Sequence, residues 1–536
     1  MKEIILRNLD LPGRSVVRSR NGMASTSHVM ASMTAVEILK KSGNAMDAAI
    51  AACAVQCVVE PESTGIGGDN FCLYSPNGAK TPFAFNGSGR APAAATAEWY
   101  QAQGITSIER QSPHSVIIPG VIDAWYQLSR DHGTMELAEL LAPAIDFAKN
   151  GYAITERVSI DWHSQFDLLN NDANARKRFL PNGAAMNPGD VHHQPELAAT
   201  MEKISKHGRD AFYTGEVAED MVSYLQSLGG LHTMEDFANA KGDYVTPIKT
   251  HFRGHDIYEC PPNGQGVIAL LMMNIMSGFD PSQHEADSVA RLHLEIEASR
   301  LAYYDRDAAL ADPTQSFIPV ENMLSQAHAD DLRSKINPER ALVDLPAVTL
   351  PKHEDTVYIS VVDKDRNCCS FINTLFSNFG SAQLAPKSGI MLTNRGQGFV
   401  LDPNHPNCIA PNKRPLHTII PGMAYKDGRA VMPFGVMGGH YQSHGHMHFL
   451  SRLFEYGDNI QEAQDRPRLF PIPGTNDVEM ESGFSDETKA AIQALGHNVI
   501  SPAKPIGGSQ AIMIDWDNGT LAGGSDPRKD GSAIGY

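Results

Sequence analysis

The chain has 536 residues, of which 42% are hydrophobic and 20% charged, as expected for a folded protein with a large buried core. Acidic residues (62) outnumber basic ones (44), so the net charge is −18 at neutral pH. Because phosphate backbones are bound by clustered Lys and Arg, this balance argues against a nucleic-acid partner and favours a small-molecule one. No run of 18 apolar residues occurs, and the N-terminal stretch lacks a signal-peptide core, so we expect a cytoplasmic protein without a membrane partner.

The first informative stretch runs from residue 27 to residue 71. Apolar residues at helical spacing over 29–39 predict a helix, with Gly43 as the left-handed residue that ends it. Residues 45–59 are apolar nearly all round, which predicts a buried helix. The Gly-rich turn "STGIGGDNF" then leads to a strand. It is not a phosphate loop, because no Lys-Ser/Thr pair follows the glycines.

Helical patterns dominate as far as residue 335. The stretch 108–235 is predicted to be helical with Pro and Gly interruptions, and "PPNGQGVIALLMMNIMSG" predicts a turn that leads into a buried helix. Residues 287–307 predict an amphipathic helix whose apolar face runs from Val289 to Tyr303. Residues 335–355 carry three prolines and many charges, which favours an exposed connector.

Strands and turns dominate after Asp355. Residues 357–363 and 368–373 flank "KDRN", and residues 419–425 and 430–434 flank "KDGR", so each pair predicts a hairpin. Helices are expected around 445–456 and 486–495, and a last strand at 512–514. Helices first and antiparallel strands second predict an α+β protein whose sheets are covered by helices on their outer faces.

Thr356 stands between the charged connector and the first of these strands. By strand pattern alone it is an ordinary β-branched strand residue. Several motifs change that interpretation; they are "GMAS", "GNAMDAAIA", "VVEPESTGIGG", "TVYISVVDKDRN", "SNFGS", "PNKRPL", "MGG" and "GSDPRKDGSAIGY". With these motifs in order, nearly the whole chain resembles the γ-glutamyltransferase family of N-terminal-nucleophile hydrolases.

The resemblance implies a four-layer αββα sandwich made from one self-cleaving precursor. Cleavage between Asp355 and Thr356 would give a large subunit, 1–355, and a small subunit, 356–536, with a dimer of these heterodimers as a further expectation. A threonine hydroxyl needs a base beside it, and the freed α-amine has an ordinary pKa of about 7.7–8.0, so Thr356 would carry its own base. No cofactor is implied.

Three further residues match family positions close to the nucleophile. Thr374, on the next strand, matches the threonine that hydrogen-bonds the region of the nucleophile; the alternative is a solvated or packed strand residue. Gly438 and Gly439 match the glycines beside the oxyanion hole, where bare backbone brings N–H groups close to a developing negative charge. As a pattern by itself, a Gly-Gly pair is simply a turn.

Four histidines follow these glycines: His440, His444, His446 and His448. The pair 440/444 has the spacing at which two histidines on a helix bind zinc. No HExxH motif is present, however, and the neighbouring glycines argue against a helix at this point. We therefore expect a helix start near the site, with the histidines as hydrogen-bonding residues, and no metal.

The chain departs from the family pattern where the glutamyl group should bind. Ser88 stands in place of the family arginine, with Arg90 two positions away; the other positions that differ are Phe376, Arg395, Gly398, His417 and Thr418. The acceptors that an α-ammonium group needs are missing, while Arg395 offers a fork suited to a carboxylate. Phe376 would shrink and dry the pocket. Arg395 could instead make a structural salt bridge.

These changes predict an amide substrate that bears a carboxylate but not necessarily an α-amino group. Similar enzymes are the small-amide hydrolase branch, exemplified by oxamate, and the β-lactam side-chain acylases. The alternatives are a γ-glutamyltransferase or glutathione hydrolase, a zinc hydrolase built on the histidines, and an uncut binding protein.

Overall fold

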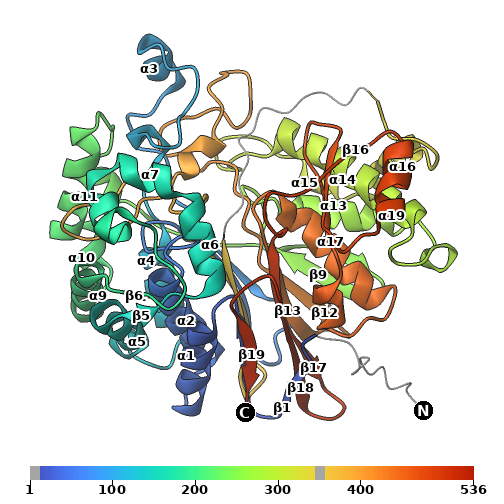
Figure 1. The fold of residues 1–536 in the computed structure, drawn as a ribbon, viewed down its shortest axis with the longest axis horizontal. Helices are drawn as coiled ribbons and strands as arrows, with labels where there is room; N and C mark the ends of the chain where they lie inside the picture. The colour runs from blue at the N-terminus through green and yellow to red at the C-terminus, as the bar shows by residue number, and fades with distance from the viewer. Residues whose placement is uncertain (1–12, 344–355) are drawn as a thin grey trace.

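The computed structural model, which describes residues 13–343 and 356–536, consists of two seven-stranded sheets packed face to face, with helices on both outer faces (Figure 1). The predicted α+β class and four-layer αββα order are therefore confirmed. All strand pairs within the two large sheets are antiparallel. Among the described residues, no helix is both long enough and apolar enough to span a bilayer.

Each large sheet combines strands from both halves of the chain. In spatial order, the first sheet contains β1 (Val17–Ser19), β18 (Thr520–Ser525), β17 (Gly508–Asp515), β13 (Arg429–Met437), β12 (Gly422–Lys426), β9 (His255–Glu259) and β8 (Ile248–Phe252). The second contains β19 (Ser532–Gly535), β2 (Met23–Thr26), β10 (Val357–Val362), β11 (Cys368–Thr374), β3 (Asp69–Ser75), β4 (Phe83–Gly87) and β7 (Asp243–Val245). Two small sheets contain β14 (Leu469–Pro471), β15 (Asp477–Met480) and β16 (Asn498–Ile500), and β5 (Tyr152–Ala153) and β6 (Val191–His192). The two halves predicted as separate subunits are thus interleaved in one core.

The helices form the two outer layers and the connections between strands. On the side of the second sheet and its connections lie α1 (Val29–Lys40), α2 (Ala45–Val59), α3 (Ala97–Ala102), α4 (Val121–His132), α5 (Leu137–Asn150), α6 (Glu156–Ser164), α7 (Phe166–Asn171), α8 (Ala173–Phe179), α9 (Pro195–His207), α10 (Asp210–Tyr213), α11 (Glu216–Ser227) and α12 (Met234–Ala238). On the side of the first sheet lie α13 (Gly266–Met276), α14 (Val289–Ala309), α15 (Val320–Met323), α16 (Gln326–Lys335), α17 (Tyr441–Phe454), α18 (Glu462–Asp465) and α19 (Asp486–Ala494). The helical pattern predicted over 108–235 is confirmed.

Apolar packing holds the layers together. Side chains such as Phe71, Tyr358 and Met423 fill the space between the two sheets. Helix α2 is buried along its whole length, as predicted, and packs on β10 and β11. Its first turn is held by a capping box in which Asn44 and Asp47 each accept a hydrogen bond from the other's backbone N–H. This fixes the helix directly behind the strand that follows Thr356.

Both predicted hairpins are present, as β10–β11 and β12–β13. The expectation that the last strand lies at 512–514 is wrong, because β18 and β19 follow it. Those strands are made mostly of small residues, which have weak strand propensity. Close packing requires these small residues, because a Cβ on Gly523 would lie 2.3 Å from Met23 Sδ.

Two details of the predicted helices need correction. The left-handed residue after α1 is Ser42, with φ of 76°, and not Gly43. Gly43 serves close packing instead, because a Cβ there would lie 2.7 Å from Ile38 Cγ2. The helix predicted as amphipathic, α14, is buried on nearly all sides and carries buried charged residues such as Arg291 and Glu295.

The described part of the predicted connector covers 336–343, and its remainder, 344–355, lies outside the described residues together with Asp355. Helix α16 ends at Lys335, where the connector was predicted to begin.

Candidate active site

Thr356 lies immediately before β10, an interior strand of the second sheet, and is fully buried. The register pairs Val357 with Asn373, which places Thr356 opposite Thr374 at the end of β11. The Oγ1 atoms of Thr356 and Thr374 are 3.5 Å apart. Thr374 Oγ1 also accepts a hydrogen bond from the Phe376 backbone N–H at 2.9 Å. The structure therefore brings the two predicted threonines together and fixes the hydroxyl of the second.

A third polar group, from Gln442, reaches Thr356 from helix α17, on the side of the first sheet. Gln442 lies in the first turn of α17 and points its Nε2 at Thr356 Oγ1, 3.4 Å away. Its Oε1 accepts a hydrogen bond from the Ile420 backbone N–H at 3.1 Å, which orients the amide so that its NH₂ faces the hydroxyl. Gln442 is not predicted from the sequence, although it lies only three residues after the Gly-Gly pair.

The glycine pair forms the sharp turn between β13 and α17. Gly438 and Gly439 have φ angles of 120° and 58°, a region that side chains other than glycine rarely adopt. A Cβ on Gly438 would also lie 2.9 Å from Gly507 Cα. The Gly439 carbonyl accepts a hydrogen bond at 2.9 Å from Gln265 Nε2, which also donates to the Thr418 carbonyl at 2.8 Å. Gln265, another residue missed from the sequence, thus ties the turn to the segment after "RPL".

Arg395 begins a short 3₁₀ helix, Arg395–Gly398, and is fully buried. Its guanidinium carbon stacks 4.0 Å from the centroid of the Phe376 ring, and its Nη1 donates to Thr418 Oγ1 at 3.2 Å. Phe376 has φ of 85°, a strained conformation for a bulky residue and one that clusters at functional sites. Among the described residues, Arg395 Nε and Nη2 have no hydrogen-bond partner.

Asp69 provides the negative charge beside this arginine. Its Oδ2 lies 3.6 Å from Arg395 Nε, an ion pair too long for a hydrogen bond. The same oxygen lies 3.1 Å from His417 Nε2, and the Gly89 backbone N–H donates to Oδ1 at 2.7 Å. Burial lowers the pKa of Arg395 to about 9, against the opposing effect of Asp69. Asp69 was not selected from the sequence, although a carboxylate directly after the glycines of "GIGGDNF" was an available signal.

His417 is neutral in this arrangement. Its Nδ1 accepts from the Ile419 backbone N–H at 3.3 Å, so its Nε2 carries the proton and donates to Asp69. Burial, with the nearby charges of Arg395 and Arg414, lowers the pKa of His417 to about 4 despite Asp69. The predicted substrate-binding residues Phe376, Arg395, His417 and Thr418 therefore form one contiguous cluster, which we call the Arg395 cluster, with Asp69 at its centre.

The two remaining residues that were predicted to bind substrate, Ser88 and Arg90, lie at the edge of the Arg395 cluster. Ser88 is buried, and its Oγ accepts from Asn263 Nδ2 at 3.2 Å. Arg90 is 27% exposed and forms ion pairs with Asp243 at 3.3 Å and Asp312 at 3.5 Å. Arg90 is thus held by two carboxylates, whereas Ser88 is linked to the Arg395 cluster through the Gly89–Asp69 hydrogen bond.

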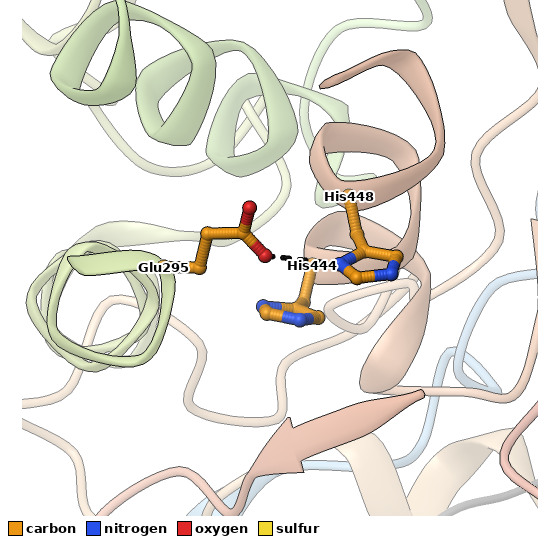
Figure 2. Close-up of side chains that lie close together, drawn as sticks. All are labelled: Glu295, His444 and His448. Carbon is orange, nitrogen blue, oxygen red and sulfur yellow. Dashed lines mark hydrogen bonds and ion pairs between the residues drawn. The ribbon is translucent and has the colours of Figure 1, made fainter. Parts of the chain in front are cut away.

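The histidine cluster lies on or beside α17, which confirms the predicted helix start near the site, whereas the doubt that the glycines raised about helix geometry here was wrong. Gly445 lies inside this helix, and close packing explains why the residue is a glycine: a Cβ there would lie 2.7 Å from Val436 Cγ1. The pair suggested for zinc, 440/444, is not the one that converges. Instead His444 and His448 approach Glu295 of α14, with candidate ligand atoms of all three within 4.8 Å of one another (Figure 2).

The surroundings of Glu295 do not suit a metal ion. Its carboxylate binds His448 Nδ1 at 2.9 Å, Arg291 Nε at 2.8 Å and Arg452 Nη1 at 2.9 Å. Burial alone would raise the pKa of Glu295, but Arg452 and Arg291 hold it well below its usual range. A divalent cation would have to displace these bonds and sit beside two guanidinium groups. The arrangement is a charge network that joins α14 to α17.

The network also faces away from Thr356. His444 follows Gln442 by two residues, which is about 200° of rotation around the helix, so the two side chains point in opposite directions. His446 pairs with Glu259 at 2.7 Å, and His440 Nδ1 lies 2.9 Å from Arg306 Nη1. The predicted role of the histidines as hydrogen-bonding residues agrees with these contacts.

Comparison with known proteins gives consistent matches over nearly the full length of the chain. The family model described as gamma-glutamyltranspeptidase matches residues 31–536. The chain is 35% identical to the glutathione hydrolase-like YwrD proenzyme of Bacillus subtilis, over 97% of this chain and 99% of that protein. It is 31% identical to the oxamate amidohydrolase proenzyme of Klebsiella pneumoniae, again over 97% and 99%. A solved cephalosporin acylase from Bacillus halodurans superposes with a TM-score of 0.92 at 36% identity, covering 100% of this chain and 99% of that one.

Proposed function

Since the chain belongs to the γ-glutamyltranspeptidase family, and is therefore a self-cleaving hydrolase of amide bonds, we propose that Thr356 is its nucleophile and that Arg395 binds a carboxylate on the acyl half of the substrate. The product of self-cleavage is a heterodimer of two subunits, and we place the cut between Asp355 and Thr356. The cut position, a dimer of heterodimers and a cytoplasmic location are part of the proposal.

The chemistry follows from the geometry around Thr356. Its hydroxyl adds to the substrate carbonyl while the free α-amine takes the hydroxyl proton. The C–N bond then breaks, the proton passes to the departing amine, and an ester to Thr356 remains. Water hydrolyses this ester and releases the acid. Backbone N–H groups at Gly438–Gly439 are the proposed donors to the oxyanion, and the Gln442 amide orients the hydroxyl.

The observation that carries the substrate proposal is the Arg395 guanidinium, which is fully buried and whose Nε and Nη2 make no hydrogen bond among the described residues, although Nε lies 3.6 Å from Asp69. Leaving buried charged donors unsatisfied is costly, and a substrate carboxylate would satisfy them. Asp69 does not replace it, because that carboxylate is shared with His417 and Gly89 and stays 3.6 Å from Nε.

An α-ammonium group fits this site less well. The acceptors that an α-ammonium group needs were predicted to be missing, and the carboxylate of Asp69 beside Arg395 corrects that prediction. Asp69 is nevertheless already committed to a guanidinium and an imidazole N–H, so a second cation would compete with Arg395 for it. The site favours an acyl group that ends in a carboxylate without an adjacent amine, of which oxamate is the smallest example.

A panel of three amides tests this proposal. Oxamate, γ-glutamyl anilide and glutathione are assayed side by side for release of the amine and the acid. We expect turnover of the oxalyl amide and weak or no turnover of the γ-glutamyl compounds. Turnover of the γ-glutamyl compounds with inert oxamate would refute the substrate proposal and favour the glutathione hydrolase alternative.

A second candidate is an acylase that acts on a larger amide. The structural similarity to the cephalosporin acylase, at a TM-score of 0.92, favours it, as does an additional pocket beside Gly438. Both candidates share the nucleophile and differ in the size of the group on the nitrogen.

A further inference from the structure

The glycine turn (Gly438–Gly439) is held in shape by hydrogen bonds to its carbonyl groups. Two successive glycines restrict the backbone little, and both adopt positive φ angles here. The Gly438 carbonyl accepts a hydrogen bond from the Tyr441 backbone N–H at 3.0 Å. Because a peptide unit is planar, this bond also fixes the direction of the Gly439 N–H. The first peptide plane of the turn is therefore set locally.

The second peptide plane is fixed through the Gly439 carbonyl, and one of its two partners comes from far away in the chain. This carbonyl accepts from the Gln442 backbone N–H at 3.2 Å and from Gln265 Nε2 at 2.9 Å. Gln265 lies 174 positions earlier, directly before α13. Since the Gln442 amide contacts Thr356, the Gly439 carbonyl joins the glycine turn to the group that orients the nucleophile.

Every hydrogen-bonding atom of the Gln265 amide has a partner. Its Nε2 donates to the carbonyls of Gly439 and Thr418, and its Oε1 accepts from Arg306 Nη1 at 3.1 Å. A guanidinium group can only donate and a carbonyl can only accept, so one orientation of the amide satisfies all three contacts and the flipped one satisfies none. Arg306 therefore selects the orientation that points the NH₂ group at the glycine turn.

Arg306 is itself held rigidly on α14, which lies with α13 and α17 on the side of the first sheet (Figure 1). It is fully buried, its Nε donates to Asp307 Oδ1 at 2.7 Å, and its guanidinium carbon lies 4.7 Å from the centroid of the Tyr303 ring. Its Nη1 also donates to His440 Nδ1 at 2.9 Å. The Tyr303 hydroxyl donates to the His440 carbonyl at 2.5 Å. Helix α14 thus holds the residue that follows the glycines through two side chains.

We propose that Gln265 and Arg306 are positioning residues for the reaction at Thr356. Arg306 orients the Gln265 amide, and this amide holds the glycine turn in the geometry that stabilises the oxyanion. The inference rests on the proposed function, which assigns the oxyanion to this turn. Donors that are already in place need no rearrangement when charge develops, and a misplacement of about 1 Å can lower a rate about 100-fold.

Loss of the Gln265 side chain should lower kcat and leave KM nearly unchanged. The segment that pairs with Arg395 has its own restraints at His417. The His417 N–H donates to the Asn263 carbonyl, and the His417 carbonyl accepts from the Gln265 backbone N–H, both at 2.9 Å. These backbone bonds remain when the side chain changes, whereas the Gly439 carbonyl loses its shorter hydrogen bond. Binding of the substrate carboxylate is thus preserved while the oxyanion site loosens.

Two single variants measure this effect. Gln265→Met keeps the length of the side chain but removes both donors, and Arg306→Lys keeps the charge without the fork that reaches two acceptors. Cleaved enzyme is assayed with whichever of oxamate, γ-glutamyl anilide and glutathione the wild type turns over. We expect kcat to fall about tenfold in Gln265→Met, less than for outright removal of an oxyanion donor. In Arg306→Lys it should fall about fivefold, the equivalent of one net hydrogen bond.

The double variant tests whether Arg306 acts through Gln265. If it does, Gln265→Met combined with Arg306→Lys should lose little more than Gln265→Met alone, whereas independent effects would multiply to about 50-fold. Arg291→Lys is the matched control, because Arg291 is also buried on α14 but pairs with Glu295 and Glu455. Its kcat should equal that of the wild type.

Four results would overturn the inference: an unchanged kcat in cleaved Gln265→Met, losses that multiply in the double variant, an equal loss in Arg291→Lys, or a higher KM at constant kcat. If Gln265→Met yields no cleaved protein, the comparison of Arg306→Lys with Arg291→Lys decides. The proposed function fails separately, if no acyl-enzyme forms on Thr356 of the wild type with any amide. Acyl-enzyme formation at an unchanged rate in Gln265→Met would refute only the positioning role.

Discussion

Replacing Arg395 tests the central electrostatic feature of the site. Arg395→Met keeps the length and the apolar contact with the Phe376 ring but removes the charge, so Asp69 keeps its bonds to His417 and Gly89. The substrate carboxylate would lose at least one charge-assisted hydrogen bond to Nη2, which is worth about 1.5–3 kcal/mol. This corresponds to a loss of about 10- to 150-fold in kcat/KM for oxalyl amides. Arg395→Lys retains a point charge without the planar fork of the guanidinium, so its kcat/KM should lie between those of the wild type and Arg395→Met.

The assay compares oxamate with oxamide, which has the same size but lacks the carboxylate. The preference for oxamate over oxamide should disappear in Arg395→Met, while self-cleavage, followed as two bands on a denaturing gel, remains. Retention of the wild-type preference in a cleaved and folded Arg395→Met enzyme would refute the assignment of this arginine to the substrate, and would support a structural salt bridge with Asp69.

Three further outcomes are expected. Thr356→Ala should abolish both self-cleavage and turnover and give one band near 58.2 kDa on a denaturing gel, whereas Thr356→Ser should retain both activities. An active Thr356→Ala enzyme, or active wild-type protein with an intact backbone at this position, would contradict the mechanism. Thermal stability should decrease as the pH falls from about 6.5 to about 4. In the folded state the pKa of His417 is lowered to about 4 and that of His444 to about 3, so both stay neutral over this range. The same histidines bind protons in the unfolded chain, which favours unfolding as the pH falls. Replacing His444 with Gln should flatten this dependence, and an unchanged slope would show that other groups cause it. Incubation with a chelator should leave turnover unchanged, and tightly bound zinc that is lost together with activity would revive the zinc-hydrolase alternative.

The charge network around Glu295 shows how far sequence spacing can be trusted. The sequence presents four histidines within nine residues, and spacing alone selected the pair 440/444. Gly445 argued against a helix because isolated glycines weaken one, yet the tight packing of α17 on Val436 leaves no room for a side chain there. Once the helix forms, His444 and His448 share a face, and the residue that meets them comes from α14, about 150 positions earlier. Nothing local to either segment specifies that contact.

Local patterns did determine much of the architecture. The apolar run 45–59, the two hairpin turns "KDRN" and "KDGR", and the helix–strand order of the two halves specified elements and class, because these depend on side-chain periodicity and turn chemistry close in the chain. The motifs around Thr356 identified the nucleophile candidate and its neighbour Thr374, which the strand register then placed opposite each other.

Tertiary structure decided what surrounds that nucleophile. Asp69, Gln265 and Gln442 reach the site from three separate segments, and their roles arise only when both sheets are stacked. The same stacking buries Arg395 against Phe376 and leaves two of its nitrogens unsatisfied among the described residues, a property of the assembled environment and of no single stretch. The sequence determines which polar and charged groups are present, whereas their burial in the tertiary structure determines the free-energy cost of leaving each of them without a hydrogen-bond partner.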